Sequence, residues 1–285
     1  MFHKKKTVWL YLAPGLLGLL AFYFVPFVWG MWFSLTDGTI DNNFVGFDNY
    51  IAVWQNEIFQ LGLKNTLELS LLCTPAIFVL SFLLASLLRK KVPGDGFFRN
   101  ALLMPYLMPS SAMLIIWLLI FDYGGVVNRL FVALGLDRVN WLDGSALRVP
   151  IVLLYIWKNL GFSVVIFTAA LQAVPEALYE YAGLEGAGWF RRQFSITLPQ
   201  ILPTAFLELV LAMVNAFKIF KEVYVISGAY PDESIYTLQH YMNNKFTKLD
   251  YQHVTTAAYS FAVIVLVLFL LLYLTKSVRQ GETAA

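Results

Sequence analysis

Residues 173–199 read AVPEALYEYAGLEGAGWFRRQFSITLP, and long apolar runs flank this stretch on both sides. Pro175 and Glu176 predict the start of a short helix, because proline fits the first helical turn and acids favour its positive end. A second, amphipathic helical turn is expected over residues 189–196. A pair of short helices that mixes apolar and charged side chains suits docking into a groove on a partner.

Glycine and proline set the expected limits of these two helices. Gly183, Gly186 and Gly188 are expected to break the first helix, since glycine tolerates the backbone angles of a helix end. Pro199 is expected to limit the second helix before the next apolar run.

The composition of the 285-residue chain is that of a membrane protein. It is 59% hydrophobic and 13% charged, against about 45–50% and about 25% in an ordinary soluble domain. This excludes a cytosolic enzyme, a disordered tail and a disulfide scaffold. The net charge of +2 is too small to indicate nucleic-acid binding, and the single cysteine, Cys73, cannot form an internal disulfide.

Six apolar runs are long enough to cross a bilayer, which takes about 20 residues per helix. We therefore expect an all-α polytopic membrane protein with six transmembrane helices. The first run follows three lysines as a signal peptide would, but it continues through Pro26 and Trp32 without a small-residue cleavage site, so it is expected to be retained. The expected spans cover about residues 8–33, 66–88, 98–121, 150–171, 201–223 and 255–275.

Basic residues predict the orientation of these spans. With the N-terminus in the cytoplasm, inside segments hold eleven Lys and Arg residues and outside segments six, which agrees with the positive-inside rule. Both termini are thus predicted to be cytoplasmic. The outside connections are each about thirty residues long, too short for a folded solute-binding domain of at least about 50 residues. The inside residues are Lys4, Lys5, Lys6, Arg89, Lys90, Lys91, Arg99, Arg191, Arg192, Lys276 and Arg279.

The quoted stretch resembles a known signature. Its Glu180-Tyr181-Ala182, the glycine Gly186 and the ending Ile196-x-Leu198-Pro199 have the spacing of the "EAA" loop of permease subunits from binding-protein-dependent ABC importers. Two departures are mild: Tyr181 stands where alanine is usual, and Glu185 where the sugar-importing branch usually has aspartate.

The resemblance extends over nearly the whole chain, on the side of the first permeases of maltose and glycerol-phosphate importers. The turn Gly228-Ala-Tyr-Pro231 departs from the commoner Gly-Gly-Pro of the family, and we interpret it as the mark of a subfamily with a different contact to the binding protein. The segments that carry the resemblance are Leu12–Gly15, Phe44–Tyr50, Asn65-Thr66, Asn140–Leu142, Gly161-Phe162 and Leu171–Glu176.

The resemblance implies a type I ABC importer permease, a single transmembrane domain over residues 1–285 in the inner membrane of a bacterium or archaeon. Its implied partners are a second homologous permease, two ATPase subunits, an extracytoplasmic solute-binding protein and the lipid bilayer, without nucleic acid. ATP and magnesium would be bound by the ATPase subunits. The chain has no G-x-x-x-x-G-K-[ST] phosphate loop, so it is not expected to be an enzyme or to hold a cofactor or metal. The implied ATPase-coupling residues, within the coupling loop 174–199, are Glu180, Ala182, Gly186, Ala187, Ile196, Leu198 and Pro199.

Polar and aromatic residues inside the spans are candidates for the solute path. The family places solute contacts on the two spans that flank the coupling loop, and aromatic faces and amides suit the C–H surfaces and hydroxyls of a sugar. The candidates are Trp157, Asn159 and Gly161 on the fourth span, and Asn215, Phe217 and Ile219 on the fifth.

Charged residues at membrane depth are functional candidates as well. They are Lys158, Glu208 and Lys218, and a pair between Lys158 and Glu208 is possible but stretched. The main hypothesis is a permease for a sugar or oligosaccharide. A glycerol-phosphate or polyol permease stays open, since Lys158 and Lys218 would favour an anionic solute, as does an ion-coupled transporter in which Glu208 carries a proton. Without H-E-x-x-H or G-x-S-x-G motifs, an intramembrane enzyme is not expected.

Overall fold

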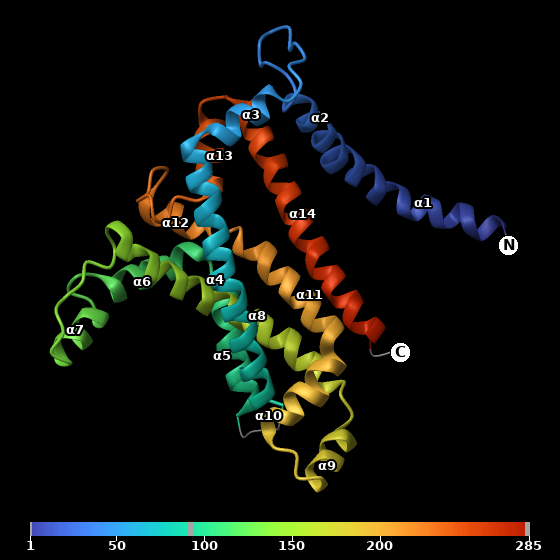
Figure 1. Ribbon diagram of the computed structural model, residues 1–285, viewed down its shortest axis with the longest axis vertical. Coiled ribbons are helices and arrows are strands. Elements are labelled where there is room, and N and C mark those ends of the chain that lie inside the picture. The colour runs from blue at the N-terminus through green and yellow to red at the C-terminus, as the bar shows by residue number, and fades with distance from the viewer. Residues whose placement is uncertain (1, 90–93, 283–285) are drawn as a thin grey trace. The chain divides into compact units, whose positions relative to one another are not determined.

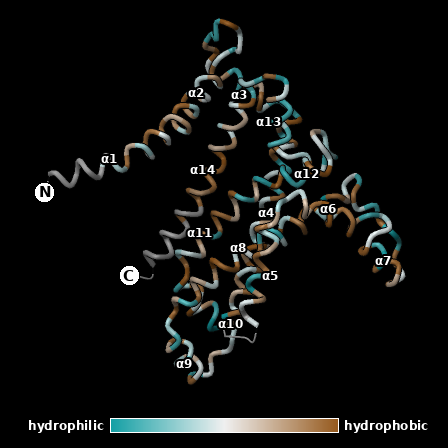
Figure 2. Tube along the Cα trace, turned by 180° about the vertical axis from the view of Figure 1, so that it is seen from behind, coloured by the Kyte–Doolittle hydropathy of each residue, from teal (hydrophilic) through white to brown (hydrophobic). Residues whose placement is uncertain are grey.

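The computed structural model describes residues 2–89 and 94–282, and within them the regular elements are all helical apart from one isolated bridge between Thr36 and Phe44 (Figure 1). Lys90 and Lys91, two of the residues used to predict orientation, lie outside the described part. Hydrophobic residues run along the long helices (Figure 2). Six helical stretches in the described residues are long and apolar enough to cross a membrane, which confirms the expected fold class: Tyr11–Phe33, Glu57–Leu87, Ser110–Ala133, Gly144–Gln172, Trp189–Ser227 and Tyr251–Leu271.

The chain forms two compact units, of which the first joins Met1–Gln60 to Tyr241–Ala285. In this unit α14 packs against α2 and α3. The hydroxyl of Tyr259 on α14 donates to the carbonyl of Phe27, and the Trp54 indole donates to Ser260 at 3.2 Å. These polar bonds join α14 to α2 and α3 in addition to the packing of their apolar side chains. The helices of this unit are α1 (Phe2–Leu19), the π-helical turn η1 (Leu20–Phe24), α2 (Val25–Phe33), α3 (Asp48–Gln55), most of α13 (Leu238–Thr247) and α14 (Tyr251–Glu282).

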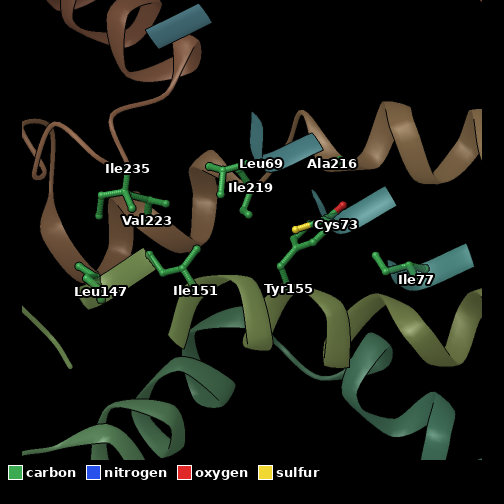
Figure 3. Close-up of a cluster of buried hydrophobic side chains, with 10 residues drawn as sticks. All are labelled: Leu69, Cys73, Ile77, Leu147, Ile151, Tyr155, Ala216, Ile219, Val223 and Ile235. Carbon is green, nitrogen blue, oxygen red and sulfur yellow. The ribbon is translucent and has the colours of Figure 1, made fainter. Parts of the chain in front are cut away.

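The second unit, Leu61–His240, is built around two long helices, α4 (Glu57–Leu87) and α8 (Arg148–Gln172). One stripe of α4 carries Leu69, Cys73 and Ile77 at four-residue spacing, so all three face one way. They pack with α8 and with the segments that follow it (Figure 3). The other members of this buried cluster are Leu147, Ile151, Tyr155, Ala216, Ile219, Val223 and Ile235.

Two of the expected spans are interrupted. Residues 98–121 form two helices, α5 (Asp95–Leu107) and α6 (Ser110–Phe121), instead of one. Met108 is extended (φ −70°, ψ 145°) because the ring of Pro109 disfavours helical angles in the residue before it. The fifth span is divided between α11 (Leu198–Ala216) and α12 (Phe220–Ser227).

Helices α5 and α8 approach each other closely at Gly161. A Cβ atom on this residue would lie 1.8 Å from the carbonyl oxygen of Leu102 on α5, well inside van der Waals contact. The glycine is therefore required by helix packing.

A small folded connection joins α6 to α8. It contains α7 (Val126–Ala133) and the 3₁₀ turn η2 (Gly144–Leu147). The buried side chain of Asn128 holds it together, bonding the backbone of Val139 in both directions and accepting from the Trp141 indole at 3.1 Å.

Candidate functional site

The first helix of the quoted stretch is α9 (Glu176–Leu184), which begins directly after Pro175 as expected. It ends in a paired set of backbone bonds: Ala187 N–H donates to Ala182 C=O at 2.9 Å, and Gly186 N–H to Gly183 C=O at 3.1 Å. Gly186 has φ +74°, the left-handed conformation that this C-terminal motif requires. Gly183 lies inside α9, so the expectation that it breaks the helix is wrong; its half-buried position faces Arg192, with no side chain of its own to accommodate.

The second helix does not stop before Pro199. α10 (Trp189–Arg192) continues through the π-helical turn η3 (Gln193–Thr197) into α11. Leu198 N–H donates to Gln193 C=O across this wide turn. The missing N–H of Pro199 therefore falls where π bonding changes to α bonding, in the first turn of α11, where proline is tolerated.

Helix α9 has two distinct faces. Tyr179, Ala182 and Gly183 are half-buried and face the protein, whereas Tyr181 and Leu184 are 69% and 86% exposed. Glu180 is on the exposed side. Large apolar side chains are thus exposed on this loop together with an acid. We call the exposed residues Glu180, Tyr181, Leu184, Phe190 and Phe194 the coupling face.

A polar cleft of about 720 Å³ lies between this loop and the end of α4. The Arg89 guanidinium stacks over the Tyr179 ring at 3.6 Å from its centre. Arg192 donates through Nε to the Ala187 carbonyl at 2.7 Å and so ties α10 to the turn that follows α9. The lining residues are Ser86, Arg89, Glu176, Tyr179, Glu180, Gly183, Trp189, Arg192 and Gln193.

The predicted coupling residues divide between surface and interior. Gly186 and Pro199 are exposed like Glu180, but Ala182, Ala187, Ile196 and Leu198 are half-buried. Leu198 packs against the core formed by α4, α8 and α11. The structure thus brings the loop residues together in one region, with some available to a partner and others holding the loop in place.

The predicted path residues on α8 have different surroundings. Trp157 is exposed and stacks on Trp117, with ring centres 5.4 Å apart. Asn159 is half-buried and donates to the Tyr155 carbonyl at 2.8 Å. Gly161 is packed against Leu102 of α5 and lines the edge of a small cavity of about 120 Å³ between α5 and α8. The first two side chains have accessible surface, whereas Gly161 serves packing.

On the fifth span, Asn215 is half-buried and accepts a hydrogen bond from Lys218 Nζ at 3.2 Å. Lys218 itself is exposed, in the break between α11 and α12. Phe217 and Ile219 are buried, and Ile219 belongs to the cluster of Figure 3. Of the three predicted path residues on this span, Asn215 is the one with a polar side chain, and the other two are buried and apolar.

The predicted charged residues Lys158 and Glu208 have different partners. Lys158 Nζ lies 2.6 Å from Glu222 Oε1 and 2.9 Å from Ser110 Oγ, with 16% and 4% of the two charged side chains exposed. Glu208, on α11, instead accepts from Ser163 of α8. The possible Lys158–Glu208 pair is therefore not made. Sequence reasoning missed Glu222, although an acid near the end of an apolar run is itself a signal.

The bundle and the coupling loop together define a membrane permease of the ABC importer class. A family model described as the binding-protein-dependent transport system inner membrane component matches residues 77–279. The chain belongs to this family, and it is a multi-pass inner-membrane permease subunit.

Three relatives resemble the chain over most of its length. It is 32% identical to the diacetylchitobiose uptake system permease protein NgcF of Streptomyces coelicolor, over 91% of this chain and 79% of the relative. It is 31% identical to the trehalose/maltose transport system permease protein MalF of Thermococcus litoralis, over 96% and 94%. It is 28% identical to the sn-glycerol-3-phosphate transport system permease protein UgpA of Shigella dysenteriae, over 98% and 97%.

A solved structure has a similar fold. A chain of a bacterial ABC transporter involved in the import of the acidic polysaccharide alginate superposes with a TM-score of 0.82 and 25% identity, covering 96% of both chains. The same type of transporter has been solved with a periplasmic protein bound to an alginate pentasaccharide, where the TM-score is 0.81 and coverage is 95% of this chain and 93% of that chain.

Proposed function

We propose that the whole chain acts as one transmembrane domain that forms part of the path for a sugar or oligosaccharide. In this proposal it works with a second homologous permease, an extracytoplasmic solute-binding protein and two ATPase subunits, which bind ATP and magnesium and hydrolyse the ATP. The coupling face and both termini lie in the cytoplasm, in agreement with the excess of basic residues in the inside segments.

The observation that carries the proposal is the geometry of the loop around α9. Its left-handed turn at Gly186 orients two short helices, and the coupling face presents one acid among four large apolar side chains. Short amphipathic helices of this kind bind in a groove of a partner. The exposed Glu180 supplies a charge-assisted contact on that surface.

An uncharged sugar is favoured over an anionic solute by the state of Lys158. This cation is neutralised by Glu222 at 2.6 Å, so it is not available to a phosphate or carboxylate of the cargo. The exposed Lys218 is the observation that favours a glycerol-phosphate solute as the second candidate. Asn159, Asn215 and the exposed face of Trp157 fit the hydroxyls and C–H surfaces of a sugar.

The test is ATP-dependent uptake by the complete importer in proteoliposomes, assembled from this chain, its co-encoded permease and ATPase subunits and its binding protein. Labelled maltose, diacetylchitobiose and sn-glycerol 3-phosphate are the probes. Saturable uptake of a sugar supports the proposal; uptake of glycerol 3-phosphate alone would favour the second candidate, and uptake that needs no ATP would overturn both.

Two variants test the coupling loop directly. Gly186→Pro cannot adopt φ +74°, and Glu180→Lys replaces an attractive contact with repulsion. Both are expected to abolish binding-protein-stimulated ATP hydrolysis and uptake together while the membrane helices still assemble. Gly188→Ala is the matched control, since no atom lies within 4 Å of its added Cβ.

Orientation is tested by labelling in intact cells with a membrane-impermeant maleimide, in a Cys73→Ser background. Cysteine at exposed Arg191 is expected to stay unlabelled, whereas cysteine at exposed Asp41 is expected to react. Rapid labelling at position 191 with none at position 41 would reverse the topology.

A further inference from the structure

We propose that Arg89, Tyr179 and Thr197 form a strut that transmits displacement of α9 to the membrane helices α4 and α11. The inference rests on the proposed function of the α9 loop and assigns positioning roles to three residues behind the coupling face. None of the three belongs to that face.

The first contact of the strut joins α9 to the end of α4. Arg89 follows the last turn of α4 and places its guanidinium 3.6 Å from the centre of the Tyr179 ring. A planar guanidinium stacks on an aromatic face in a way that the compact ammonium of lysine does not reproduce. Such a cation–π contact is worth about 0.5–1 kcal/mol where exposed and about 2 kcal/mol or more where desolvated.

The second contact joins α9 to the start of α11. Tyr179 Oη lies 2.8 Å from Thr197 Oγ1. Thr197 also lies 3.3 Å from the Arg192 carbonyl, to which its hydroxyl donates. Because a hydroxyl has a single proton to give, Tyr179 is the donor in the bond to Thr197. Thr197 is fully buried and ends the π turn that leads into α11.

The Tyr179 ring also packs against the buried core at this end of the unit. That core contains Ala85 of α4, Phe167 of α8 and Ile201 of α11. The other residues on the inward face of α9, Ala182 and Gly183, are small. Tyr179 is therefore the large side chain on the inward face of α9, and it packs against a core to which α4, α8 and α11 contribute.

A strut makes a prediction that simple packing does not. If Tyr179 acts through the hydroxyl of Thr197, then removing either hydroxyl breaks the same connection, and removing both does no further harm. The readout is the number of ATP molecules hydrolysed per maltose, or per other accepted probe sugar, imported by the reconstituted importer. A residue that only stabilises the fold changes the amount of assembled complex but not this ratio.

The variants are Tyr179→Phe, Thr197→Val and their combination. Each single change is expected to raise the ratio about two- to tenfold, the equivalent of one net hydrogen bond, and the double variant is expected to match the singles. Thr197→Ser keeps the hydroxyl and should restore the wild-type ratio. Arg89→Gln should raise the ratio further than Arg89→Lys, which keeps the cation.

The matched controls come from a second cation–π contact outside the loop. Arg138 lies over the exposed Tyr123 ring at 5.6 Å, so Arg138→Gln and Tyr123→Phe make the same chemical changes away from α9. Both are expected to keep the wild-type ratio.

The strut is refuted if Tyr179→Phe and Thr197→Val keep the wild-type ratio, or if their effects add in the double variant. If the Tyr179→Phe chain fails to assemble, the comparison of Thr197→Val with Thr197→Ser decides: equal ratios in these two variants refute the strut. If the wild-type importer shows no ATP-dependent uptake, the proposed function itself fails. If wild type couples normally and the variants equal it, the strut alone fails.

Discussion

The exchange Glu222→Gln removes the negative charge that faces Lys158 and leaves a largely buried ammonium with neutral hydrogen-bond partners such as Ser110. The pair is short, 2.6 Å between Lys158 Nζ and Glu222 Oε1, and 16% and 4% of the side chains are exposed. Breaking a pair at this depth costs about 3–5 kcal/mol, because the charge left behind cannot be solvated. The hydrogen bond to Ser110 at 2.9 Å persists, so we expect a loss near the lower limit, about 3 kcal/mol.

The assay is the free energy of unfolding of the purified chain in mixed detergent micelles, followed by tryptophan fluorescence. The double variant Lys158→Met/Glu222→Gln removes both charges and is expected to recover most of the lost stability, because a buried pair can be replaced by neutral side chains at little cost. The control is Glu68→Gln, which breaks the Arg148–Glu68 pair at 2.8 Å. Its side chains are 31% and 41% exposed, so the loss should stay below about 1 kcal/mol.

Two results would refute this reasoning. One is a Glu222→Gln chain as stable as wild type, which would mean that water or lipid headgroups solvate Lys158. The other is a double variant whose loss equals the sum of the losses in Glu222→Gln and in the single variant Lys158→Met, which would mean that the two charges do not act on each other.

Three further changes have definite expected outcomes. Gly161→Ala places a Cβ 1.8 Å from the Leu102 carbonyl oxygen and should destabilise the chain by several kcal/mol in the same unfolding assay, whereas Gly188→Ala, with open space around it, should be nearly neutral. Burial lowers the pKa of His240 to about 4 from an ordinary 6.5, so the unfolded chain binds the proton first as the pH drops. The free energy of unfolding should therefore fall between pH 6.5 and pH 4, and it should depend less on pH in His240→Asn. Asn215→Leu should reduce sugar uptake without reducing the amount of assembled complex, and uptake at the wild-type rate would remove Asn215 from the path.

The coupling loop could be predicted from the sequence because its signals are local. Pro175 begins α9, and the left-handed turn falls on Gly186, where a residue without a Cβ is favoured. The expectation that Gly183 breaks the helix is wrong, because glycine allows unusual backbone angles but does not impose them. A small residue is suited to this position because the guanidinium of Arg192 packs against it.

The long-range contacts could not be predicted in the same way. Glu222 and Lys158 are 64 positions apart, and their meeting depends on how α8 and α12 pack. The break at Met108 and Pro109 does have a local cause, because proline restricts the residue before it. The break at Phe217–Ile219 contains neither glycine nor proline, so the sequence carries no such signal there.

Both interrupted spans meet the unbroken α8 at Lys158. Ser110 lies at the start of α6, and Glu222 lies in the first turn of α12. A new helix begins at each place with its positive end nearby, which favours the acid and disfavours the lysine. Glu222 therefore stabilises the positive end of α12 and also neutralises Lys158. The lysine is tolerated beside the start of α6 because its charge is neutralised in this way. This polar cluster holds the helix breaks in place, so loss of the pair is expected to change the stability of the chain and leave the sugar concentration for half-maximal uptake unchanged.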